Sequence, residues 1–356
     1  MNNLSKPKHS SALKLEMKKF LSKSGFTLFV IMLLMVFLAP FGYMLTTSVK
    51  DREMITGSDA PILPSRPAQY EYNGEEYPVL LVPDENGNFH EWAIIKKGRE
   101  ESTFIDTKNP ETGPIQWEGK WRTLEKVWNF DPVWSNFAYV WETAKMPQML
   151  RNTLIISVIG AIGTLLSCTA VAYGFSRFRI PGKSILFMLL ISSVILPQFV
   201  TIVPTYVVFE KLGWIGSWLP LIIPHFFANA YNVFLLRQFF LTIPRELDEA
   251  AMIDGAGPLR RLISIIIPQS IPVLVAVGVF HFMWAWNDFF GPLLYLSTKK
   301  DLQPISIGIQ LFNAQYSFQP HMVQAAALLG MILPLGLFFI AQRVFMRGIV
   351  FTGVEK

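Results

Sequence analysis

The sequence contains little charge and almost no cysteine. Only 16 % of its 356 residues are charged, whereas soluble proteins carry about 25 %. The single cysteine, Cys168, cannot form an internal disulfide, which excludes a disulfide-stabilised scaffold. Hydrophobic residues make up 51 % of the chain and 29 residues are Phe, so a disordered chain is excluded as well. This composition predicts a membrane protein.

Long stretches of the chain are free of charge. The first lies between Lys23 and Lys50. A membrane-spanning helix needs about 20 mainly apolar residues. The fold class we predict is an all-α polytopic membrane protein with six transmembrane helices, near residues 26–47, 152–176, 185–208, 215–240, 269–295 and 322–345.

Basic residues gather on one side of these helices. The N-terminal tail, 1–25, holds six lysines, and further Lys and Arg residues lie after the second and fourth helices and at the C-terminus. The short loops opposite hold only Lys211, Lys299 and Lys300. Because Lys and Arg mark the cytoplasmic side, we expect both termini in the cytoplasm and the first helix as an uncleaved anchor. The net charge of +5 thus reflects topology, and we expect no nucleic acid as a partner.

Residues 51–131 differ from the rest and predict a small extracytoplasmic insert between the first two helices. Short β-like runs alternate with turn signals such as Asn73-Gly74 and Asn109-Pro110. We predict an antiparallel sheet over about 69–123, then a short helix over 132–144. Residues 132–356 form the remaining membrane core.

The insert region is rich in tryptophan. Two interpretations fit these rings: a core for the small module with contact to the membrane surface, which we favour, or stacking platforms for sugar. The residues concerned are Trp92, Trp117, Trp121, Trp128, Trp134 and Trp141.

The loop 244–268, between the fourth and fifth helices, is the most informative segment. Pro244 suits the first turn of a helix, Gly255 a left-handed C-terminal cap, and Pro258 the start of a second helix. A charged face is predicted from Arg245, Glu246, Asp248 and Glu249. Such a helix cannot bury itself in lipid, so we expect it to dock into a cytoplasmic protein.

This loop resembles the EAA loop of ABC importer permeases. The family pattern is Glu-Ala-Ala, three residues, Gly, nine residues, Ile-x-Leu-Pro, and Ile267 replaces the Leu here. The matching residues, with the neighbouring acid, are Glu249, Ala250, Ala251, Asp254, Gly255, Ile265 and Pro268. The segments Arg151–Ser157, Tyr173–Phe178 and Trp284–Phe289 are similar to the carbohydrate uptake branch, whose MalG-type members have six helices.

The resemblance implies a type I ABC importer permease in a bacterial plasma membrane. It implies four kinds of partner: a second permease in a heterodimer, two ATPase subunits, an extracellular solute-binding protein and membrane lipid. ATP and Mg would be used by the ATPases, with no cofactor bound by this chain. Glu249 would be the charged contact to the ATPase, Ala250 and Ala251 the close-packing surface, and Gly255 the turn. The insert is longer than the family usually carries, so its role is not implied.

A second group of residues lies near the end of the predicted fifth helix. Trp284, Trp286, Asn287 and Asp288 offer indole rings for stacking on sugar and polar groups for hydroxyls. Asp288 is the one acid that we place inside a membrane helix, where a carboxylate costs roughly 3 kcal/mol unless it faces protein or water. Two interpretations stay open: a substrate pathway, or polar groups that satisfy backbone freed near Gly291 and Pro292.

Other functions are less well supported by the sequence. No complete phosphate-binding loop, metal-ligand spacing or nucleophile–base arrangement is visible, so we expect neither catalytic nor metal-binding residues. An ion-coupled secondary transporter usually needs charged relays inside the membrane, and one acid is a poor match. A membrane receptor would need a cytoplasmic output domain. Within the ABC class, a peptide or amino-acid permease remains open.

Overall fold

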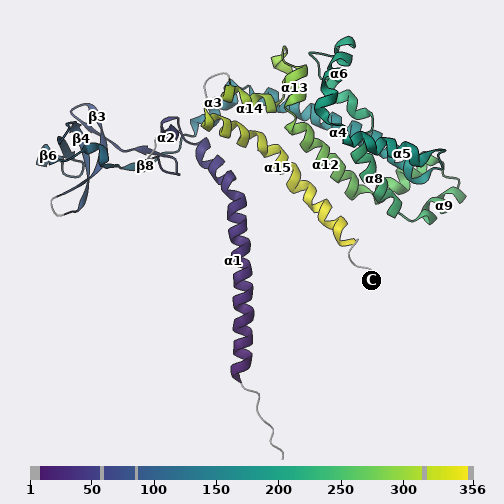
Figure 1. Ribbon diagram of the computed structural model, residues 1–356, viewed down its shortest axis with the longest axis horizontal. Helices are drawn as coiled ribbons and strands as arrows, with labels where there is room; N and C mark the ends of the chain where they lie inside the picture. The colour runs from purple at the N-terminus through teal and green to yellow at the C-terminus, as the bar shows by residue number, and fades with distance from the viewer. Residues whose placement is uncertain (1–8, 57–59, 85–86, 315–318, 352–356) are drawn as a thin grey trace, which may run out of the picture. The chain divides into compact units, whose positions relative to one another are not determined.

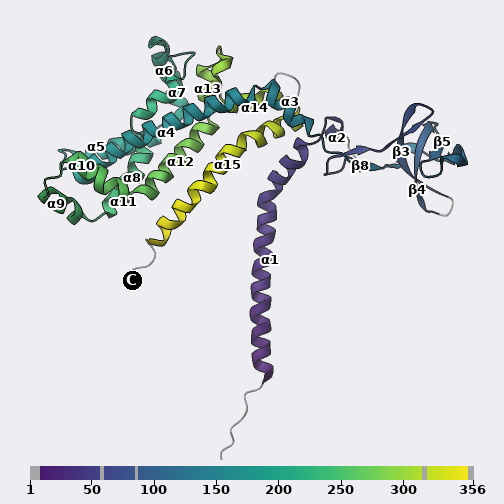
Figure 2. The same ribbon diagram turned by 180° about the vertical axis from the view of Figure 1, so that it is seen from behind.

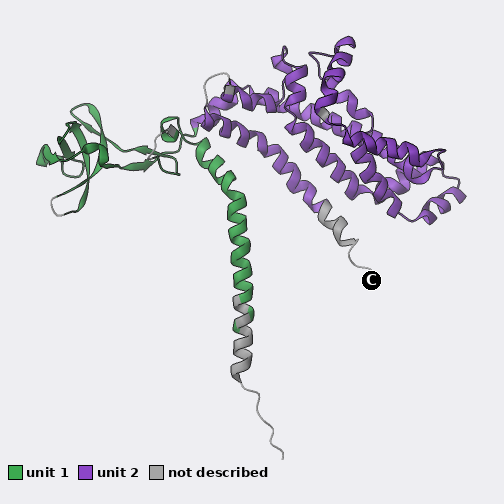
Figure 3. Cartoon of the chain, viewed as in Figure 1, with its two compact units in different colours: residues 1–134 green, residues 135–356 purple. Residues whose placement is uncertain are grey.

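The computed structural model describes residues 9–56, 60–84, 87–314 and 319–351. The chain divides into two compact units, residues 1–134 and 135–356 (Figure 3). The first contains the N-terminal helix and the insert, and the second contains the other helices.

The first unit begins with one long helix, α1 (His9–Ser48). Its apolar part, Ser22–Ser48, is long enough to cross a membrane. The side chains from Ser22 to Tyr43 are all exposed in the chain alone, as suits a helix that meets lipid or another subunit. The predicted basic tail begins at residues 1–8, which lie outside the described residues.

The insert is an antiparallel sheet, as predicted. Its strands follow the order β2-β3-β4-β5-β6, and β7 pairs with β3. Asn73 and Gly74 have φ values of 54° and 83°, so they form a tight turn between β2 and β3. The strands are β1 (Ser65–Pro67), β2 (Gln69–Tyr72), β3 (Glu75–Pro83), β4 (Phe89–Lys96), β5 (Glu101–Asp106), β6 (Ile115–Glu118), β7 (Glu125–Lys126) and β8 (Trp128–Phe130); short helices are α2 (Glu53–Thr56), η1 (Pro110–Thr112) and η2 (Trp121–Thr123).

A two-stranded ribbon closes the insert at its base. β1 pairs with β8 in antiparallel register, with Ser65 opposite Phe130 and Pro67 opposite Trp128. These strands were not predicted, because three residues carry too little pattern to identify a strand. The entry and exit of the sheet therefore lie next to each other.

The tryptophans of the insert divide between core and surface. Trp92, Trp117 and Trp121 pack with Phe104 in one hydrophobic cluster, which agrees with the core interpretation for these three rings. Trp134 is 67 % exposed and contributes little to such a core.

The second unit is helical, and its elements are shown in Figures 1 and 2. The helices α4, α8 and α12 pack against one another, and α15 packs against α12. The full set is α3 (Ser135–Thr143), α4 (Met146–Arg177), α5 (Lys183–Ser192), η3 (Ser193–Ile195), α6 (Gln198–Lys211), α7 (Leu219–Ile222), η4 (Ile223–Phe226), α8 (Ala230–Thr242), α9 (Arg245–Ile253), α10 (Pro258–Arg261), η5 (Leu262–Ile266), α11 (Ile267–Gln269), α12 (Ile271–Asn287), α13 (Phe290–Tyr295), η6 (Lys300–Leu302), α14 (Ile305–Ala314) and α15 (Pro320–Phe351).

Three of the six predicted membrane helices are not continuous. The predicted helix 215–240 is divided into α7, η4 and α8, and residues 227–229 between η4 and α8 are not helical. Among the described residues, four helices are long and apolar enough to span a membrane, or up to six if each of two bent pairs counts as one span. The predicted helix 185–208 bends by 101° between Ile195 and Phe199, beside Pro197. The predicted helix 269–295 is wrong at its end, because α12 stops at Asn287 and a separate helix, α13, follows.

The core of the second unit lies along α4. One cluster joins Cys168 and Tyr173 of α4 to Leu236 and Phe240 of α8. The Cys168 side chain is fully buried, and its sulfur lies 3.8 Å from the Asn229 amide nitrogen. A second cluster joins α4 to α12, α14 and α15 around Trp286. The helix α9 lies at the end of this unit opposite α3 and α14 (Figures 1 and 2).

Candidate functional site

The predicted docking helix is present as α9, which begins at Arg245. Pro244 lies immediately before the helix in extended conformation, one position earlier than predicted. Glu246 and Asp248 lie in the first turn, where carboxylates are favoured by the helix dipole. The sequence around Pro244 thus starts a short helix at the end of α8.

The end of α9 has the predicted left-handed glycine. Gly255 has φ +75°. Its N–H donates to the Met252 carbonyl at 3.0 Å, and the Ala256 N–H donates to the Ala251 carbonyl at 2.8 Å. These two bonds form a Schellman motif, which satisfies carbonyls left over at the helix end. The second helix starts at Pro258, as predicted.

The surface of α9 combines charge with exposed apolar side chains. Glu249, Ala250 and Asp254 are exposed, and Ala251 is half-buried. Ile253 is 88 % exposed, and Met252 and Leu247 are also exposed. A large apolar side chain open to water is costly, so this surface fits contact with another protein.

The prediction that Asp248 belongs to the exposed charged face is wrong. Its side chain is buried and its Oδ2 lies 3.0 Å from Nε of Arg177, the last residue of α4. The side chains of Arg177 and Asp248 are 5 % and 7 % exposed. This pair is not predictable from the sequence, because Arg177 and Asp248 are far apart in the chain.

In addition to this ion pair, two hydrogen bonds attach the same turn of α4 to the loop. Arg177 Nη2 donates to the Ile243 carbonyl at 2.9 Å, just before α9. The Tyr173 hydroxyl donates to the Pro258 carbonyl at 3.1 Å, just after it. The end of α4 therefore contacts the loop on both sides of α9.

The last residues of the EAA pattern lie where the chain changes direction. Ile265 belongs to η5, a short π-helical stretch, and is half-buried. Pro268 belongs to α11 and is exposed. The segment Pro258–Gln269 meets α12 at an angle of 82°. A π-helical stretch and a proline both interrupt the regular hydrogen bonds of a helix, which accounts for a bend here.

Asp288 is not inside a helix, contrary to the prediction. It follows the last residue of α12, and its carboxylate accepts a hydrogen bond from the Gly291 N–H at 3.1 Å. Asn287 donates from its amide to the Met283 carbonyl at 2.7 Å. Asp288 therefore meets backbone near Gly291, as the structural interpretation of this segment expects, whereas Asn287 bonds a carbonyl within α12 instead.

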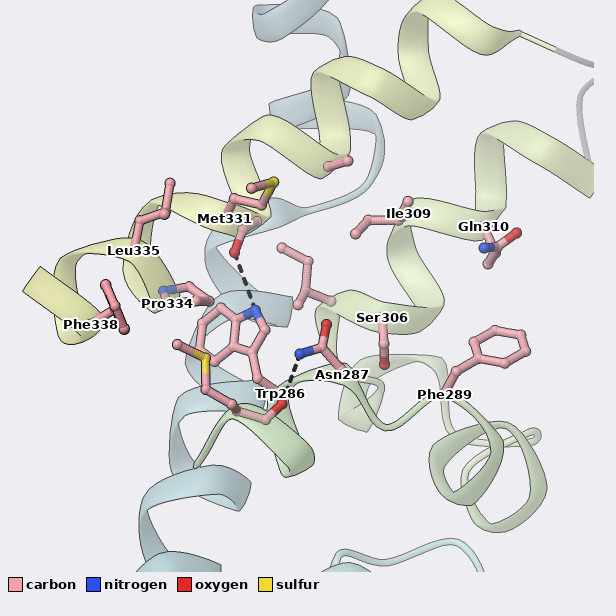
Figure 4. A pocket seen from close by; sticks show the side chains of 14 residues that line it. Trp286, Asn287, Phe289, Ser306, Ile309, Gln310, Met331, Pro334, Leu335 and Phe338 are labelled. Atoms are coloured by element: carbon pink, nitrogen blue, oxygen red, sulfur yellow. Dashed lines mark hydrogen bonds between the residues drawn. The ribbon is translucent and has the colours of Figure 1, made fainter. Parts of the chain in front are cut away.

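The two candidate tryptophans face different cavities. Trp286 is buried, stacks on Phe282 and donates from Nε1 to the Gly330 carbonyl of α15 at 3.2 Å. Figure 4 shows it beside Asn287, Ser306 and Met331, lining a cavity of about 540 Å³. Its indole is held by α15, which leaves little freedom for stacking on a solute.

Trp284 is half-exposed and lies between two other cavities. The first, about 480 Å³, is also lined by Asn287, Asp288, Phe199 and Phe290. The second, about 560 Å³, adds polar groups that were not predicted as site residues: His225, Asn229, Asn232 and His281. Candidate pathway residues therefore extend from Asp288 along one side of α12 toward α8.

Comparisons with known proteins agree with this geometry. Residues 161–350 match the family described as binding-protein-dependent transport system inner membrane component. An osmoprotective compounds uptake permease protein, GgtD, of Synechocystis sp. is 30 % identical over 269 residues, covering 74 % of this chain and 88 % of that protein. An sn-glycerol-3-phosphate transport system permease protein, UgpE, of Pectobacterium atrosepticum is 34 % identical over 226 residues, covering 61 % and 80 %.

A solved structure shares the fold. It is a bacterial ABC transporter involved in the import of the acidic polysaccharide alginate, with a TM-score of 0.61, 17 % identity, and coverage of 96 % of this chain and 99 % of that chain. The resemblance seen in the EAA loop is confirmed, and a transporter permease is not itself an enzyme. This chain belongs to the family of inner membrane components of binding-protein-dependent transport systems.

Proposed function

We propose that this chain is one of two different permease subunits in an ATP-driven importer of a carbohydrate or another polyhydroxylated solute. Two ATPase subunits would use ATP and Mg on the cytoplasmic side, where both termini of the chain lie. A binding protein would deliver the solute from outside. The named solutes of the relatives, sn-glycerol-3-phosphate among them, support a hydroxyl-rich cargo.

The observation that carries this proposal is the surface of α9. The Glu249-Ala250-Ala251 segment and the exposed Ile253 lie on one short helix at the end of the second unit, and the left-handed Gly255 follows that helix directly. We propose that this surface enters a cleft of the ATPase. Small residues allow close approach, and the apolar side chains gain about 1.5–3 kcal/mol each when fully buried.

The mechanism follows from moving α9 as a rigid body. Closure of the two ATPases on ATP would bring the α9 helices of both permeases together. The membrane helices would then change from an inward-facing to an outward-facing arrangement, which is a two-state rearrangement of packed elements. Trp284 and Asn287 of α12, with Asp288 directly after it, would line the pathway that opens.

The experiment that tests this proposal is purification of the tagged chain from native membranes in mild detergent, with mass spectrometry of what accompanies it. We expect a second permease and an ATPase. Recovery of this chain alone in several detergents would contradict the proposal and favour a secondary transporter. The binding protein encoded with the complex would then be screened against sugars, polyols, phosphorylated polyols and peptides.

A matched pair of variants identifies the docking surface. Ile253→Asp places a charge in the proposed ATPase contact, so we expect the ATPase to be lost while the second permease remains. Ile62→Asp makes the same change at an isoleucine that is 81 % exposed in the insert, and all partners should remain. Retention of the ATPase by Ile253→Asp at wild-type level would show that α9 does not dock in this way.

A further inference from the structure

We propose that α4, although not connected to α9 in sequence, is the membrane helix that receives the motion of α9, and that Asp248 and Arg177 form the attachment. Both are positioning residues, since they act by holding α9 on α4. This inference rests on the proposed function and adds the route by which the ATPase would drive the membrane helices.

The attachment is a buried ion pair on an otherwise exposed helix. Glu246 and Glu249 of α9 are open to water, whereas Asp248 turns inward onto Arg177. Pulling the two apart inside the protein would leave two buried charges without their partner, which is strongly unfavourable. The pair therefore resists separation of α9 from α4 more strongly than a surface pair would.

The contacts on either side of α9 reinforce this attachment. Arg177 also holds the Ile243 carbonyl, and Tyr173 holds the Pro258 carbonyl. Tyr173 and Arg177 are four residues apart and so share one face of α4. The last turn of α4 thus contacts the chain before α9, α9 itself and the chain after it.

The backbone also connects α9 to the membrane helices, to α8 before it and to α12 after it, but both of these connections are less direct. Before α9, the backbone at Ile243 and Pro244 is extended, with ψ of 126° and 137°. After α9, the π-helical η5 and the 82° bend precede α12. Junctions of this kind absorb rotation, as hinge residues do. The side-chain attachment to α4 is the stiffer connection.

α4 is well placed to pass motion on. It packs along both α8 and α12, which carry Asn232 and His281 in the cavity beside Trp284. Displacing the C-terminal turn of α4 would shift the packing of both helices at once.

The test uses the complete complex, with its ATPase, second permease and binding protein, in proteoliposomes. The readout is solute transported per ATP hydrolysed. Asp248→Asn keeps the size of the side chain and removes its charge, and we expect this ratio to fall about tenfold. The reversed pair, Arg177→Asp with Asp248→Arg, should recover much of it. Asp131→Asn, in an exposed pair with Arg66, is the matched control and should leave it unchanged.

A distance measurement distinguishes loss of the attachment between α4 and α9 from a general loss of stability. Spin labels at Arg179→Cys and Glu246→Cys, both exposed positions, report the separation of the end of α4 from α9. We expect one distance with and without ATP in the wild-type background, and a broadened, ATP-dependent distance with Asp248→Asn.

Different outcomes distinguish this inference from the proposed function. Wild-type complex that hydrolyses ATP without solute uptake contradicts the proposed function. The attachment is overturned if the wild-type complex transports solute while Asp248→Asn gives a ratio of solute to ATP within about twofold of the wild-type ratio and the same spin-label distance. If Asp248→Asn does not assemble with its partners, the reversed pair is decisive. A reversed-pair complex that couples ATP hydrolysis to transport supports the attachment, and one that assembles but does not couple them overturns it.

Discussion

At the scale of single residues, Gly160 of α4 allows α4 and α12 to pack closely. A methyl group on Gly160 would lie 2.7 Å from Nε2 of His281, which is too close. The imidazole cannot move freely, because its Nδ1 lies 3.1 Å from the Thr164 hydroxyl and the residue is buried.

We therefore predict that Gly160→Ala destabilises the second unit by about 1–3 kcal/mol, the usual cost of overpacking. The measurement is the thermal midpoint of the detergent-solubilised protein, followed by fluorescence-detected size exclusion.

Gly174→Ala is the matched control on the same helix. A methyl group there meets no described atom within 4 Å, so alanine should be neutral or slightly stabilising because it favours the helix. Equal midpoints for the two variants would show that the His281 contact does not limit packing.

Asp248 shows where prediction from the sequence fails at this scale. Glu246, Asp248 and Glu249 look alike in a charged stretch, and their spacing does not say which one is buried. The burial of Asp248 depends on Arg177, which tertiary folding brings to it. Gly255 was predictable because a local pattern, a glycine after a short helix, suffices for a left-handed cap.

At the scale of elements, the strongest prediction concerns the left-handed turn at Gly255, which ends α9. Gly255 has open space around it but a left-handed backbone, so the difficulty for other residues is conformational. Other L-residues pay roughly 1–2 kcal/mol in this conformation. We predict that Gly255→Leu disturbs the cap, keeps the membrane helices folded and uncouples ATP hydrolysis from uptake.

The measurement is solute uptake and ATP hydrolysis by the reconstituted complex. Gly113→Leu is the control, because Gly113 in the insert also has a positive φ, +79°, and open space around it. Near-normal uptake by Gly255→Leu would refute the role of this turn.

Hydrophobic runs predicted where apolar helices lie but not where they break. α1, α4 and α15 follow their charge-free stretches closely. The bend beside Pro197 and the end of α12 at Asn287 occur inside apolar sequence, where hydropathy gives no signal of direction. The helix α14 was missed for a related reason, since it is too short to resemble a membrane span.

At the scale of the whole molecule, the insert is built as a separable module. Its sheet has its own hydrophobic clusters, and the β1–β8 ribbon brings Pro67 and Trp128 opposite each other. We predict that replacing residues 68–127 by Asn-Gly, a natural tight turn, leaves a chain that still inserts and assembles with its partners.

Copurification of the second permease and the ATPase checks this prediction. Deletion of α14 serves as the contrast, because its buried Ile305 and Phe312 belong to the core of the second unit, and assembly should then fail. Loss of assembly in the shortened insert would mean that the sheet is needed by a partner subunit.

The family was predictable at this scale, but the candidate pathway was only partly so. The EAA pattern is local, and the chain carries all of it except the Leu, which is Ile267 here. The cavities beside Trp284 combine residues of η4, α8 and α12, so His225 and Asn232 became candidates only once the helices were placed. Trp286 looked equivalent to Trp284 in the sequence, yet the helix turns it toward α15 instead.

The buried position of Cys168 has a practical consequence. It is the only thiol in the chain, and its side chain is fully buried in the cluster between α4 and α8, next to Asn229. Thiol reagents react with exposed thiolates, so the native protein should remain unlabelled under mild conditions. Fluorophores and crosslinkers can therefore be attached at chosen cysteines without first removing the natural one, and the working cycle can be followed in an otherwise unaltered chain.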